Sequence, residues 1–295
     1  MASRSILVLG SQGMVGRAVA SHLTSQGLEM IGTQRRDRNE PAYLDAEADA
    51  ETWEPLLAKI GDGYVVNCIG VLKNEIVEAE SDSVLRAVCI NATFPHRIAH
   101  AAARRGAKLI HVSTDGVFAG GRPAPYMEKE HPDCSDHYGR TKLLGECPAD
   151  NALNLRCSII GCDPFRRKGL LEWLLRQPDG GEISGYTDHA WNGVTALQVA
   201  RLCAAICSGD SFDVLRRMSP VHHFCPNAPT TKYDLLCAWK DAIGKTITIH
   251  PVKSGNPAGS RLLGTQYAGL QTLYPRHQDW RQILEELAFT RLNDA

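Results

Sequence analysis

The sequence lacks an excess of either charge, and it lacks any long apolar run. Its 295 residues carry 32 Lys and Arg against 33 Asp and Glu, which gives a net charge of −1. Without a basic excess the chain lacks the field that is typical of nucleic-acid binding. Apolar runs such as SILVL, at residues 5–9, are far shorter than the ~20 residues that cross a bilayer. The N-terminus has no extended apolar segment of the secretory kind. No nucleic-acid or membrane partner is therefore expected.

The ten cysteines include no C-x-x-C pair. Scattered cysteines in a chain of this size are typical of a reduced compartment, so we expect a cytoplasmic protein whose thiols pack as small core residues. Cys203 and Cys207 lie four residues apart on a predicted helix, without further ligands at metal spacing. The adjacent His222 and His223 would point to opposite faces of a strand. No metal site is therefore expected.

Short apolar runs alternate with helical patterns through the first 160 residues. The predicted strands are SILVLG, LEMIGTQ, GYVVNCIG, AKLIHVST and ALNLRCSIIG, with helices between them, and residues 81–106 are predicted to be mostly helical. Apolar strands that alternate with helices predict a parallel sheet covered on both faces. Hydrophobic residues make up 43% of the chain, which is enough for a substantial core. We therefore expect an α/β fold.

The alternation of strands and helices breaks after Gly161. Residues 163–193 are richer in glycine, proline and aromatic residues than the segments before them. We expect residues 1–160 to form a dinucleotide-binding domain, to which residues 192–228 return. Residues 161–191 and 229–295 are expected to form a smaller substrate-binding region.

Three glycines lie at the junction of the first strand and the first helix. Gly10, Gly13 and Gly16 form G-x-x-G-x-x-G, which permits a tight turn and a close approach of the backbone. The helix that follows, starting at Met14 and Val15, would present unpaired N–H groups to a diphosphate. A turn that sterics require without any ligand is the alternative. The place of the motif in a β–α–β series favours a dinucleotide site and a Rossmann-type doubly wound sheet.

The end of the second predicted strand reads GTQRRDR. Arg35 and Arg36 come directly after the strand, before Asp37. An arginine here favours a ribose 2′-phosphate, whereas an acidic residue favours a free 2′-hydroxyl. This order favours NADP(H), with NAD(H) as the other possible cofactor. A solvated basic loop without a ligand is the alternative.

A tyrosine and a lysine lie four residues apart in HYGRTKLLGE. On a helix Tyr138 and Lys142 would share one face. A nearby ammonium favours the phenolate, so we expect Lys142 to lower the pKa of Tyr138 from its ordinary value near 10. Taken alone, such a pair also occurs as ordinary surface residues on many helices.

The order of these motifs resembles the extended short-chain dehydrogenase/reductases. The signals are the glycine turn, VVNCIG at the third strand, STDGVF after the fourth and Y-x-x-x-K on the next helix. The nearest branch in order and spacing is that of dTDP-4-dehydrorhamnose reductase and related sugar-nucleotide 4-keto reductases, on STDGVFAGG, PYMEKE, YGRTKLLGE and LRCSIIG. WNGVTALQVA and TTKYDLL match later family segments more loosely.

The resemblance implies an NADPH-dependent reductase of a nucleotide-sugar substrate, in which Thr114, Tyr138 and Lys142 are the catalytic residues. Tyr138 would give a proton to the ketone oxygen while the cofactor delivers hydride to the carbon. The cofactor would lie beside Asp45 and the backbone of Cys68, Ile69 and Gly70, and Lys142 would also hydrogen-bond its nicotinamide ribose. The branch often has an aromatic residue where this sequence has Gly116, which we expect to leave more room above the nicotinamide.

Residues that could contact the substrate are less clearly marked. Trp191 could stack on a sugar or base, and Asn192 and Thr195 could bond sugar hydroxyls; Arg261 is a further candidate. Ordinary packing is the alternative for each. The basic segment 166–168 either meets the substrate diphosphate or is a solvated face.

The assembly that we consider for this chain is a homodimer.

Three other functions stay open. A sugar-nucleotide 4,6-dehydratase usually has an acidic residue where Gly116 stands, and an epimerase usually has a different segment after the fourth strand. A non-catalytic, NADP-binding regulatory subunit is the third alternative, although the retention of Thr114, Tyr138 and Lys142 favours an enzyme.

Overall fold

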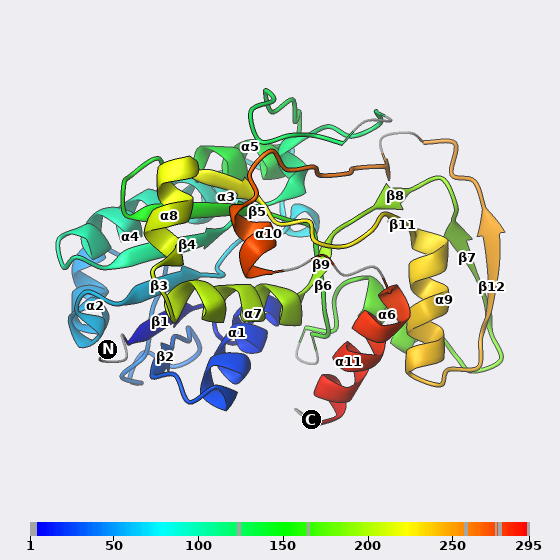
Figure 1. The fold of residues 1–295 in the computed structure, drawn as a ribbon, viewed down its shortest axis with the longest axis horizontal. Coiled ribbons are helices and arrows are strands. Elements are labelled where there is room, and N and C mark those ends of the chain that lie inside the picture. The colour runs from blue at the N-terminus through cyan, green and yellow to red at the C-terminus, as the bar shows by residue number, and fades with distance from the viewer. Residues whose placement is uncertain are drawn as a thin grey trace.

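The computed structural model describes residues 5–122, 125–163, 166–256, 259–274, 276 and 279–293. A large sheet with helices on both faces occupies one side of the molecule (Figure 1). A smaller group of helices and short strands, from later in the chain, lies beside it (Figure 1).

The large sheet has six strands in the order β10-β5-β4-β3-β1-β2, all parallel. The chain runs from β1 outward to β2 and then crosses to β3 on the other side of β1, so the strand order reverses there. Ligands of such sheets bind outside the carboxyl ends of the strands at this reversal. The prediction of an α/β, doubly wound parallel sheet is confirmed. The strands are β1 (Ile6–Leu9), β2 (Met30–Gly32), β3 (Tyr64–Asn67), β4 (Lys108–Val112), β5 (Ala152–Arg156) and β10 (Val221–His223).

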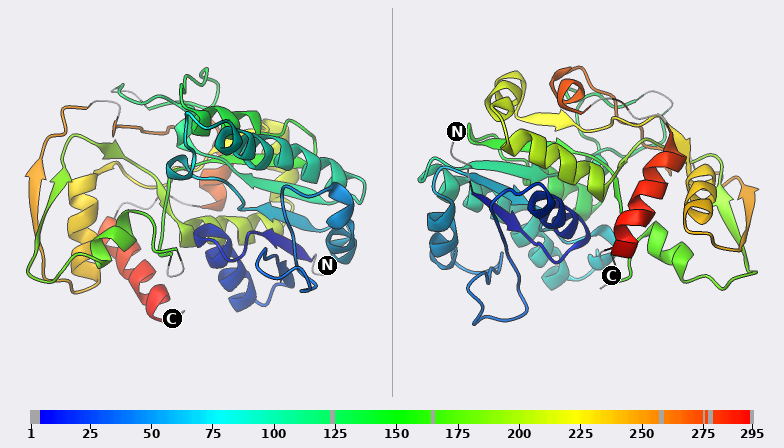
Figure 2. Two further views of the ribbon diagram at one scale, coloured as in Figure 1. Left: turned by 180° about the vertical axis from the view of Figure 1, so that it is seen from behind. Right: turned by 60° about the horizontal axis from the view of Figure 1, so that its bottom comes forward.

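The helices cover both faces because alternate residues of the strands point to opposite sides. In β1, Ile6 and Val8 pack with residues of α1 and α7, whereas Leu7 and Leu9 pack with residues of α2 and α4; all four are fully buried. Figure 2 shows the two layers from behind and from below. One layer contains α1 (Met14–Ser25), α7 (Ala196–Cys207) and α8 (Ser211–Met218). The other contains α2 (Glu54–Ile60), α3 (Ser81–Ala87), α4 (Phe94–Ala103) and α5 (His137–Leu144).

Two predicted elements are divided in the structure. The fifth predicted strand becomes β5 and a separate β6 (Ile159–Ile160), which leaves the sheet and pairs with β9 (Val194–Thr195). The predicted long helix at 81–106 contains a π-helical turn, η3 (Val88–Thr93), between α3 and α4. Such turns are frequent at functional sites. Here the turn carries Asn91, whose amide bonds both backbone groups of Val71 and the hydroxyl of Thr141 on α5.

The smaller group of elements has its own core, in which Leu174, Leu236, Trp239 and Leu284 are almost fully buried. Helix α10 (Gly269–Leu273) instead contacts α7 and α8 beside the large sheet, and Leu270 joins the core there. The predicted domain boundaries remain a prediction. The elements of the smaller group are α6 (Leu170–Leu175), β7 (Glu182–Tyr186), β8 (Ala190–Trp191), β11 (Thr230–Thr231), α9 (Lys232–Ala242), β12 (Thr248–Val252) and α11 (Trp280–Asn293).

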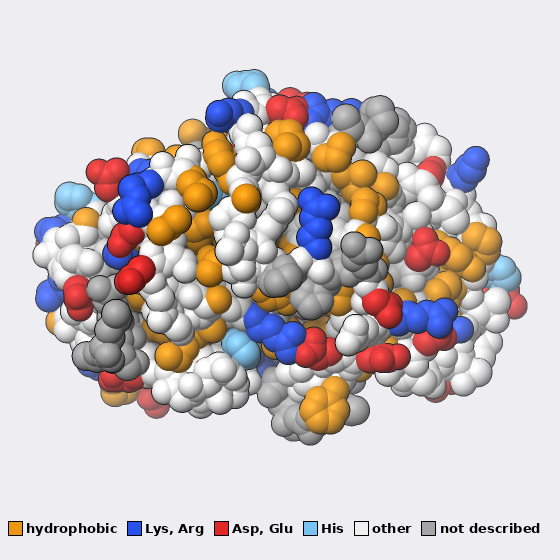
Figure 3. All heavy atoms as spheres, in the orientation of Figure 1, with side chains coloured by type: hydrophobic (Ala, Val, Ile, Leu, Met, Phe, Trp, Pro, Cys, Tyr) orange, Lys and Arg blue, Asp and Glu red, His pale blue; other side chains and the backbone are white. Residues whose placement is uncertain are grey.

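The surface carries both signs of charge. Figure 3 shows acidic and basic side chains interspersed over one face. Among the residues that the structure describes, no helix combines the length and the apolar character that crossing a membrane requires.

A buried ion pair joins the end of α5 to the sheet. Arg156, the last residue of β5, donates from Nε and Nη2 to the two carboxylate oxygens of Glu146, each at 2.7 Å. Ser113 Oγ donates to the same carboxylate at 2.7 Å. The side chains of Arg156 and Glu146 are 5% and 6% exposed. This pair therefore fixes α5 against β5 and against the segment that follows β4.

Replacing Glu146 alone should destabilise the protein strongly, because it leaves a buried guanidinium without its counter-charge. We expect Glu146→Ala to lower the free energy of unfolding by about 3–5 kcal/mol, measured by urea denaturation. The double variant Glu146→Leu/Arg156→Met, which removes both charges, should lose much less. A double variant as unstable as the single one would contradict this account.

Candidate active site

The glycine turn at the end of β1 is close-packed. Gly10 has φ +75°, a conformation that other residues rarely adopt, and a Cβ at Gly16 would lie 2.2 Å from the carbonyl oxygen of Gly10. Gly13 N donates to that same oxygen at 3.0 Å, and α1 begins at Met14. The turn therefore brings the N-terminus of α1 to the carboxyl ends of the strands, where its N–H groups favour an anion.

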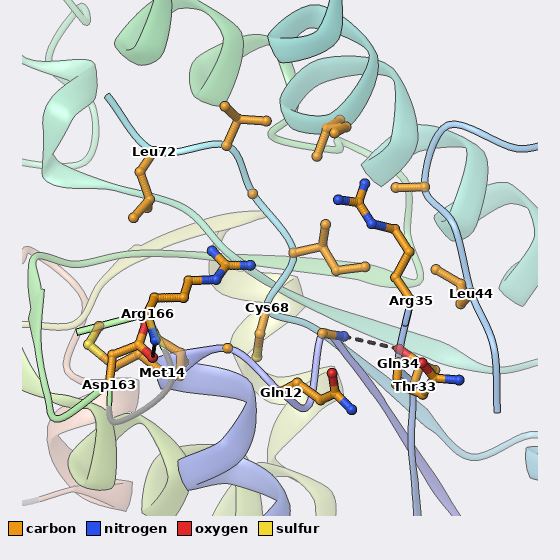
Figure 4. Close-up of a pocket in the computed structure, with 18 of the residues that line it drawn as sticks. Gln12, Met14, Thr33, Gln34, Arg35, Leu44, Cys68, Leu72, Asp163 and Arg166 are labelled. Carbon is orange, nitrogen blue, oxygen red and sulfur yellow. Dashed lines mark hydrogen bonds between the residues drawn. The ribbon is translucent and has the colours of Figure 1, made fainter. Parts of the chain in front are cut away.

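A pocket of about 470 Å³ opens beside this turn. Gln34, Arg35 and Arg36 line one end of it. Figure 4 shows the guanidinium groups of Arg35 and Arg166 pointing into it from separate parts of the chain. The predicted cofactor residues that line it are Gly10, Gly13, Met14, Val15, Arg35, Arg36, Cys68, Ile69 and Gly70.

Three predicted cofactor residues, Gly16, Asp45 and Lys142, lie outside this lining, and Lys142 lines a second, adjoining pocket. Gly16 acts through the close contact with Gly10. The carboxylate of Asp45 accepts from Glu47 N at 3.1 Å, while its neighbours Leu44 and Ala46 line the pocket. A role for Asp45 beside an adenine stays a prediction.

The end of the pocket at Arg35 and Arg36 contains a third arginine. Arg86, on α3, joins Arg35 and Arg36 in the lining. Glu47 is the nearby counter-charge, 3.4 Å from Arg35 Nη1 and 3.7 Å from Arg86 Nε. Asp37 is turned into its own loop, where its carboxylate accepts from Asn39 N at 2.9 Å. Sequence reasoning missed Arg86, because nothing in the pattern of α3 marks which of its residues faces the sheet edge.

A second pocket, of about 280 Å³, continues from the first. The two share Met14, Val15 and the segment 68–72. The second pocket contains the three predicted catalytic residues, Thr114, Tyr138 and Lys142, together with Arg261. One elongated site therefore runs from the arginine-rich end, past the glycine turn, to the tyrosine and the lysine.

Thr114 and Tyr138 are held by local caps. Thr114 begins the 3-10 helix η4 (Asp115–Val117), and its Oγ1 accepts from Gly116 N at 3.0 Å. Asp136 caps α5 by accepting from Gly139 N at 2.7 Å, which places Tyr138 in the first turn. The Thr114 hydroxyl is close enough to the Tyr138 hydroxyl to lower its pKa. They therefore face the same part of the pocket.

The expectation that Gly116 leaves extra room is wrong. A Cβ at this position would lie 3.0 Å from Tyr138 Cε1 and 3.2 Å from Thr114 Oγ1. The ring of Tyr138 fills that space. Glycine at 116 therefore allows the tyrosine to approach Thr114 closely.

The expected effect of Lys142 on Tyr138 is also wrong in this structure. Burial raises the pKa of Tyr138 to about 12, and the Thr114 hydroxyl offsets this only in part. Lys142 is not among the main causes of this shift. At neutral pH Tyr138 is therefore a neutral phenol with a proton to donate.

Lys142 is buried in a chain of polar groups behind the pocket. Its Nζ donates to Val112 O at 2.7 Å and lies 3.5 Å from His111 Nε2. Asn67 accepts from Ile69 N through Oδ1, so its Nδ2 donates to His111 Nδ1 at 3.1 Å. These bonds assign the imidazole proton to Nε2, facing Lys142.

This arrangement makes the ammonium form of Lys142 less stable than that of a free lysine. Burial lowers the pKa of Lys142 to about 8, and the nearby Glu146 carboxylate acts in the opposite direction. The pKa of His111 is also well below its ordinary value, first because of burial and then because of Lys142. Lys142 and His111 therefore both lose a proton more easily than the free side chains do.

Of the four predicted substrate residues, Arg261 lines the second pocket, and its guanidinium donates to Phe118 O at 2.8 Å. Trp191 packs against Trp280, with ring centroids 5.2 Å apart. Asn192 bonds both backbone groups of Leu263, and Thr195 caps α7. Substrate contact by these last three stays a prediction.

The described residues contain no cluster of His, Cys, Asp and Glu that could hold a metal ion.

Comparison with known proteins gives one family and two kinds of relative. The family model described as RmlD substrate binding domain matches residues 4–288. Methionine adenosyltransferase 2 subunit beta of Xenopus tropicalis is 28% identical over 84% of this chain and 77% of its own length. The dTDP-4-dehydrorhamnose reductase of Mycolicibacterium smegmatis is 25% identical over 97% of this chain and 85% of its own length.

Solved structures share the whole fold. A dTDP-4-dehydrorhamnose reductase from Clostridium acetobutylicum superimposes with a TM-score of 0.75 at 20% identity, covering 99% of this chain and 100% of its own. The enzyme of the same name from Bacillus anthracis, solved in complex with NADP, gives a TM-score of 0.75 at 17% identity, with 98% and 99% covered.

The lowered pKa of Lys142 should make stability depend on pH. Between pH 8 and 10.5 the unfolded chain keeps this proton and the folded protein loses it, so stability should rise with pH. We expect the wild type to gain stability relative to Lys142→Met across this window, in urea denaturation at several pH values. A difference between the two proteins that stays constant from pH 7 to 10 would contradict the lowered pKa.

Proposed function

The chain belongs to the RmlD substrate binding domain family, and from this premise we propose that it is an NADPH-dependent reductase of the 4-keto group of a nucleotide-diphospho-deoxysugar. The observation that carries the proposal is the meeting of Thr114, Tyr138 and Lys142 in one pocket that continues into the pocket at the glycine turn. The relatives named as dTDP-4-dehydrorhamnose reductases support the substrate class.

The residues present fit a dinucleotide with a 2′-phosphate. Gly10, Gly13 and the start of α1 form a cradle for a diphosphate. Arg35, Arg36 and Arg86 would hold a 2′-phosphate at the far end, and segment 68–70 and Lys142 would hold the nicotinamide half. When bound, the reduced cofactor supplies the hydride. The Bacillus anthracis structure, solved with NADP, supports this cofactor, and NAD(H) remains the second choice.

Tyr138 and Thr114 would act on the ketone oxygen. As the carbonyl carbon gains hydride, its oxygen gains the proton of the Tyr138 hydroxyl and becomes the new alcohol. The Thr114 hydroxyl would donate a hydrogen bond to the same oxygen, held in place by the bond from Gly116 N to its Oγ1. Tyr138 is left as a phenolate, which the ammonium form of Lys142 would stabilise before a proton from solvent restores the phenol.

The related dehydratase chemistry is less well supported. A dehydratase needs a carboxyl group near the sugar ring, and the position after Asp115 is Gly116, filled by the ring of Tyr138. Asp115 itself is buried and bonded to the Thr114 hydroxyl at 3.3 Å. A reductase needs no further acid.

A second candidate function is a non-catalytic, NADP-binding regulatory subunit. The similarity to proteins named methionine adenosyltransferase 2 subunit beta favours it. Such a subunit would bind the dinucleotide and carry out no turnover. The presence of Thr114, Tyr138 and Lys142 together in one pocket favours the enzyme.

Turnover separates the two functions. We expect the wild type to oxidise NADPH stoichiometrically with one of a panel of dTDP-, UDP-, GDP- and CDP-linked 4-keto-6-deoxy sugars. Tyr138→Phe should lose about 10²–10⁴-fold in rate, because the proton donor is gone, while NADPH binding measured by fluorescence stays nearly unchanged. Binding without turnover by the wild type would support the regulatory subunit. Full turnover by the variant, with chemistry rate-limiting, would refute the role of Tyr138.

The arginines at the end of β2 should set the cofactor preference. We expect the wild type to prefer NADPH by about ten- to a hundredfold in kcat/KM, because guanidinium–phosphate bonds are charge-assisted but partly exposed here. Arg35→Ala/Arg36→Ala should remove most of this preference. Arg38→Ala, which removes an exposed charge from the same loop, is the matched control. A double variant that keeps its preference would show that these arginines do not read the phosphate.

A further inference from the structure

The loop between β6 and α6 is built around Asp163. The buried carboxylate of Asp163 accepts from Arg166 N at 3.0 Å, and its carbonyl oxygen accepts from Arg167 N at 2.7 Å. Asp163 N donates to the buried side chain of Glu172 at 3.0 Å. Arg167 has φ +52°, and among the described residues no other non-glycine residue has a positive φ. A conformation of this kind costs free energy and is common at ligand sites.

The consequence of this loop shape is the position of Arg166. Its side chain lines the first pocket together with Gly13 and Met14, at the N-terminus of α1. Figure 4 shows its guanidinium group reaching into the pocket from the side of Asp163 and Met14. Arg166 is absent from the lining of the second pocket, where Thr114 and Tyr138 lie. The alternative that it meets the substrate diphosphate is therefore disfavoured.

An ion pair ties the same loop to the segment that follows Leu72, and Leu72 itself lines the pocket. Lys168 Nζ lies 2.8 Å from Glu75 Oε1, on the 3-10 helix η2 (Lys73–Glu75). Glu75 Oε2 accepts from Leu72 N at 3.1 Å. Arg166 Nη1 is 4.0 Å from Glu75, so the contact is long, and Lys168 supplies the closer counter-charge. The guanidinium of Arg166 is therefore available to bind another anion in the pocket.

We propose that Arg166 binds the diphosphate of the dinucleotide against the N-terminus of α1, and that the Lys168–Glu75 ion pair holds the loop in position for it. This inference rests on the proposed cofactor. Arg35 and Arg36 lie at the other end of the pocket, where the 2′-phosphate would be. Arg166 lies beside Gly13, where the turn already favours a diphosphate. The cofactor would thus be held between the sheet and a loop of the later region.

Equilibrium binding by calorimetry tests this with three ligands. NADPH and NADH contain the diphosphate, and 2′-AMP contains the 2′-phosphate but no diphosphate. We expect Arg166→Ala to bind both dinucleotides about tenfold more weakly, the loss of one partly exposed charge-assisted contact, and to bind 2′-AMP like the wild type. Lys168→Ala should show a smaller loss of the same pattern. Arg217→Ala, an exposed arginine on α8, is the control for the loss of one charge and should bind as the wild type does.

Each other result overturns the inference in a recognisable way. Unchanged dinucleotide binding by Arg166→Ala would show that the guanidinium makes no contact. A loss confined to NADPH would place Arg166 on the 2′-phosphate, and an equal loss for 2′-AMP would point to a damaged pocket. If Arg166→Ala does not fold, Arg166→Gln, which keeps most of the side chain, takes its place. It should show the same loss of dinucleotide binding. A wild type that binds neither dinucleotide would refute the proposed cofactor, and the inference with it.

Discussion

The geometry of the candidate site depends on the buried ion pair between Glu146 and Arg156. Glu146 follows the helix that carries Tyr138 and Lys142, and it also accepts from Ser113, which precedes Thr114. Two charges are removed from water to make this pair, and only bidentate geometry with further hydrogen bonds compensates for that cost. The same carboxylate raises the pKa of Lys142 against the effect of burial. One interaction therefore both positions the predicted catalytic residues and moderates the charge of one of them, Lys142.

The π-helical turn supports the other side of the same helix. Asn91 bonds both backbone groups of Val71, in the segment that lines both pockets, and the hydroxyl of Thr141 on α5. Gly145 allows the end of α5 to approach this turn, since a Cβ there would lie 1.9 Å from Asn91 O. The segment at Val71 and helix α5 are thus fixed relative to each other by a single buried amide.

Burial gives the site an electrostatic character that differs from a simple ammonium–phenolate pair. Tyr138 holds its proton more tightly than a free tyrosine, and Lys142 holds its proton less tightly than a free lysine. Positively charged side chains lie instead at the other end of the site, where Arg35, Arg36 and Arg86 line the first pocket. Arg166 lies between that end and Tyr138. An anionic dinucleotide would therefore be oriented by charge along the pocket before the neutral phenol acts on its substrate.

The sequence by itself determined the features that repeat locally or depend on spacing. The alternation of apolar strands and helices predicted the parallel sheet, and the spacing of Gly10, Gly13 and Gly16 predicted the turn at its first strand. The i, i+4 spacing of Tyr138 and Lys142 predicted that they would share one face of a helix. Tertiary structure decided the rest, because burial and hydrogen-bond partners come from elements far apart in the chain. It divided the fifth strand, turned Trp191 onto Trp280, placed Tyr138 in the space beside Gly116 and raised the pKa of that tyrosine. Arg166 reached the wall of the first pocket only because the Asp163 loop folds back over the N-terminus of α1, and local sequence carries no signal for a contact between segments about 150 residues apart.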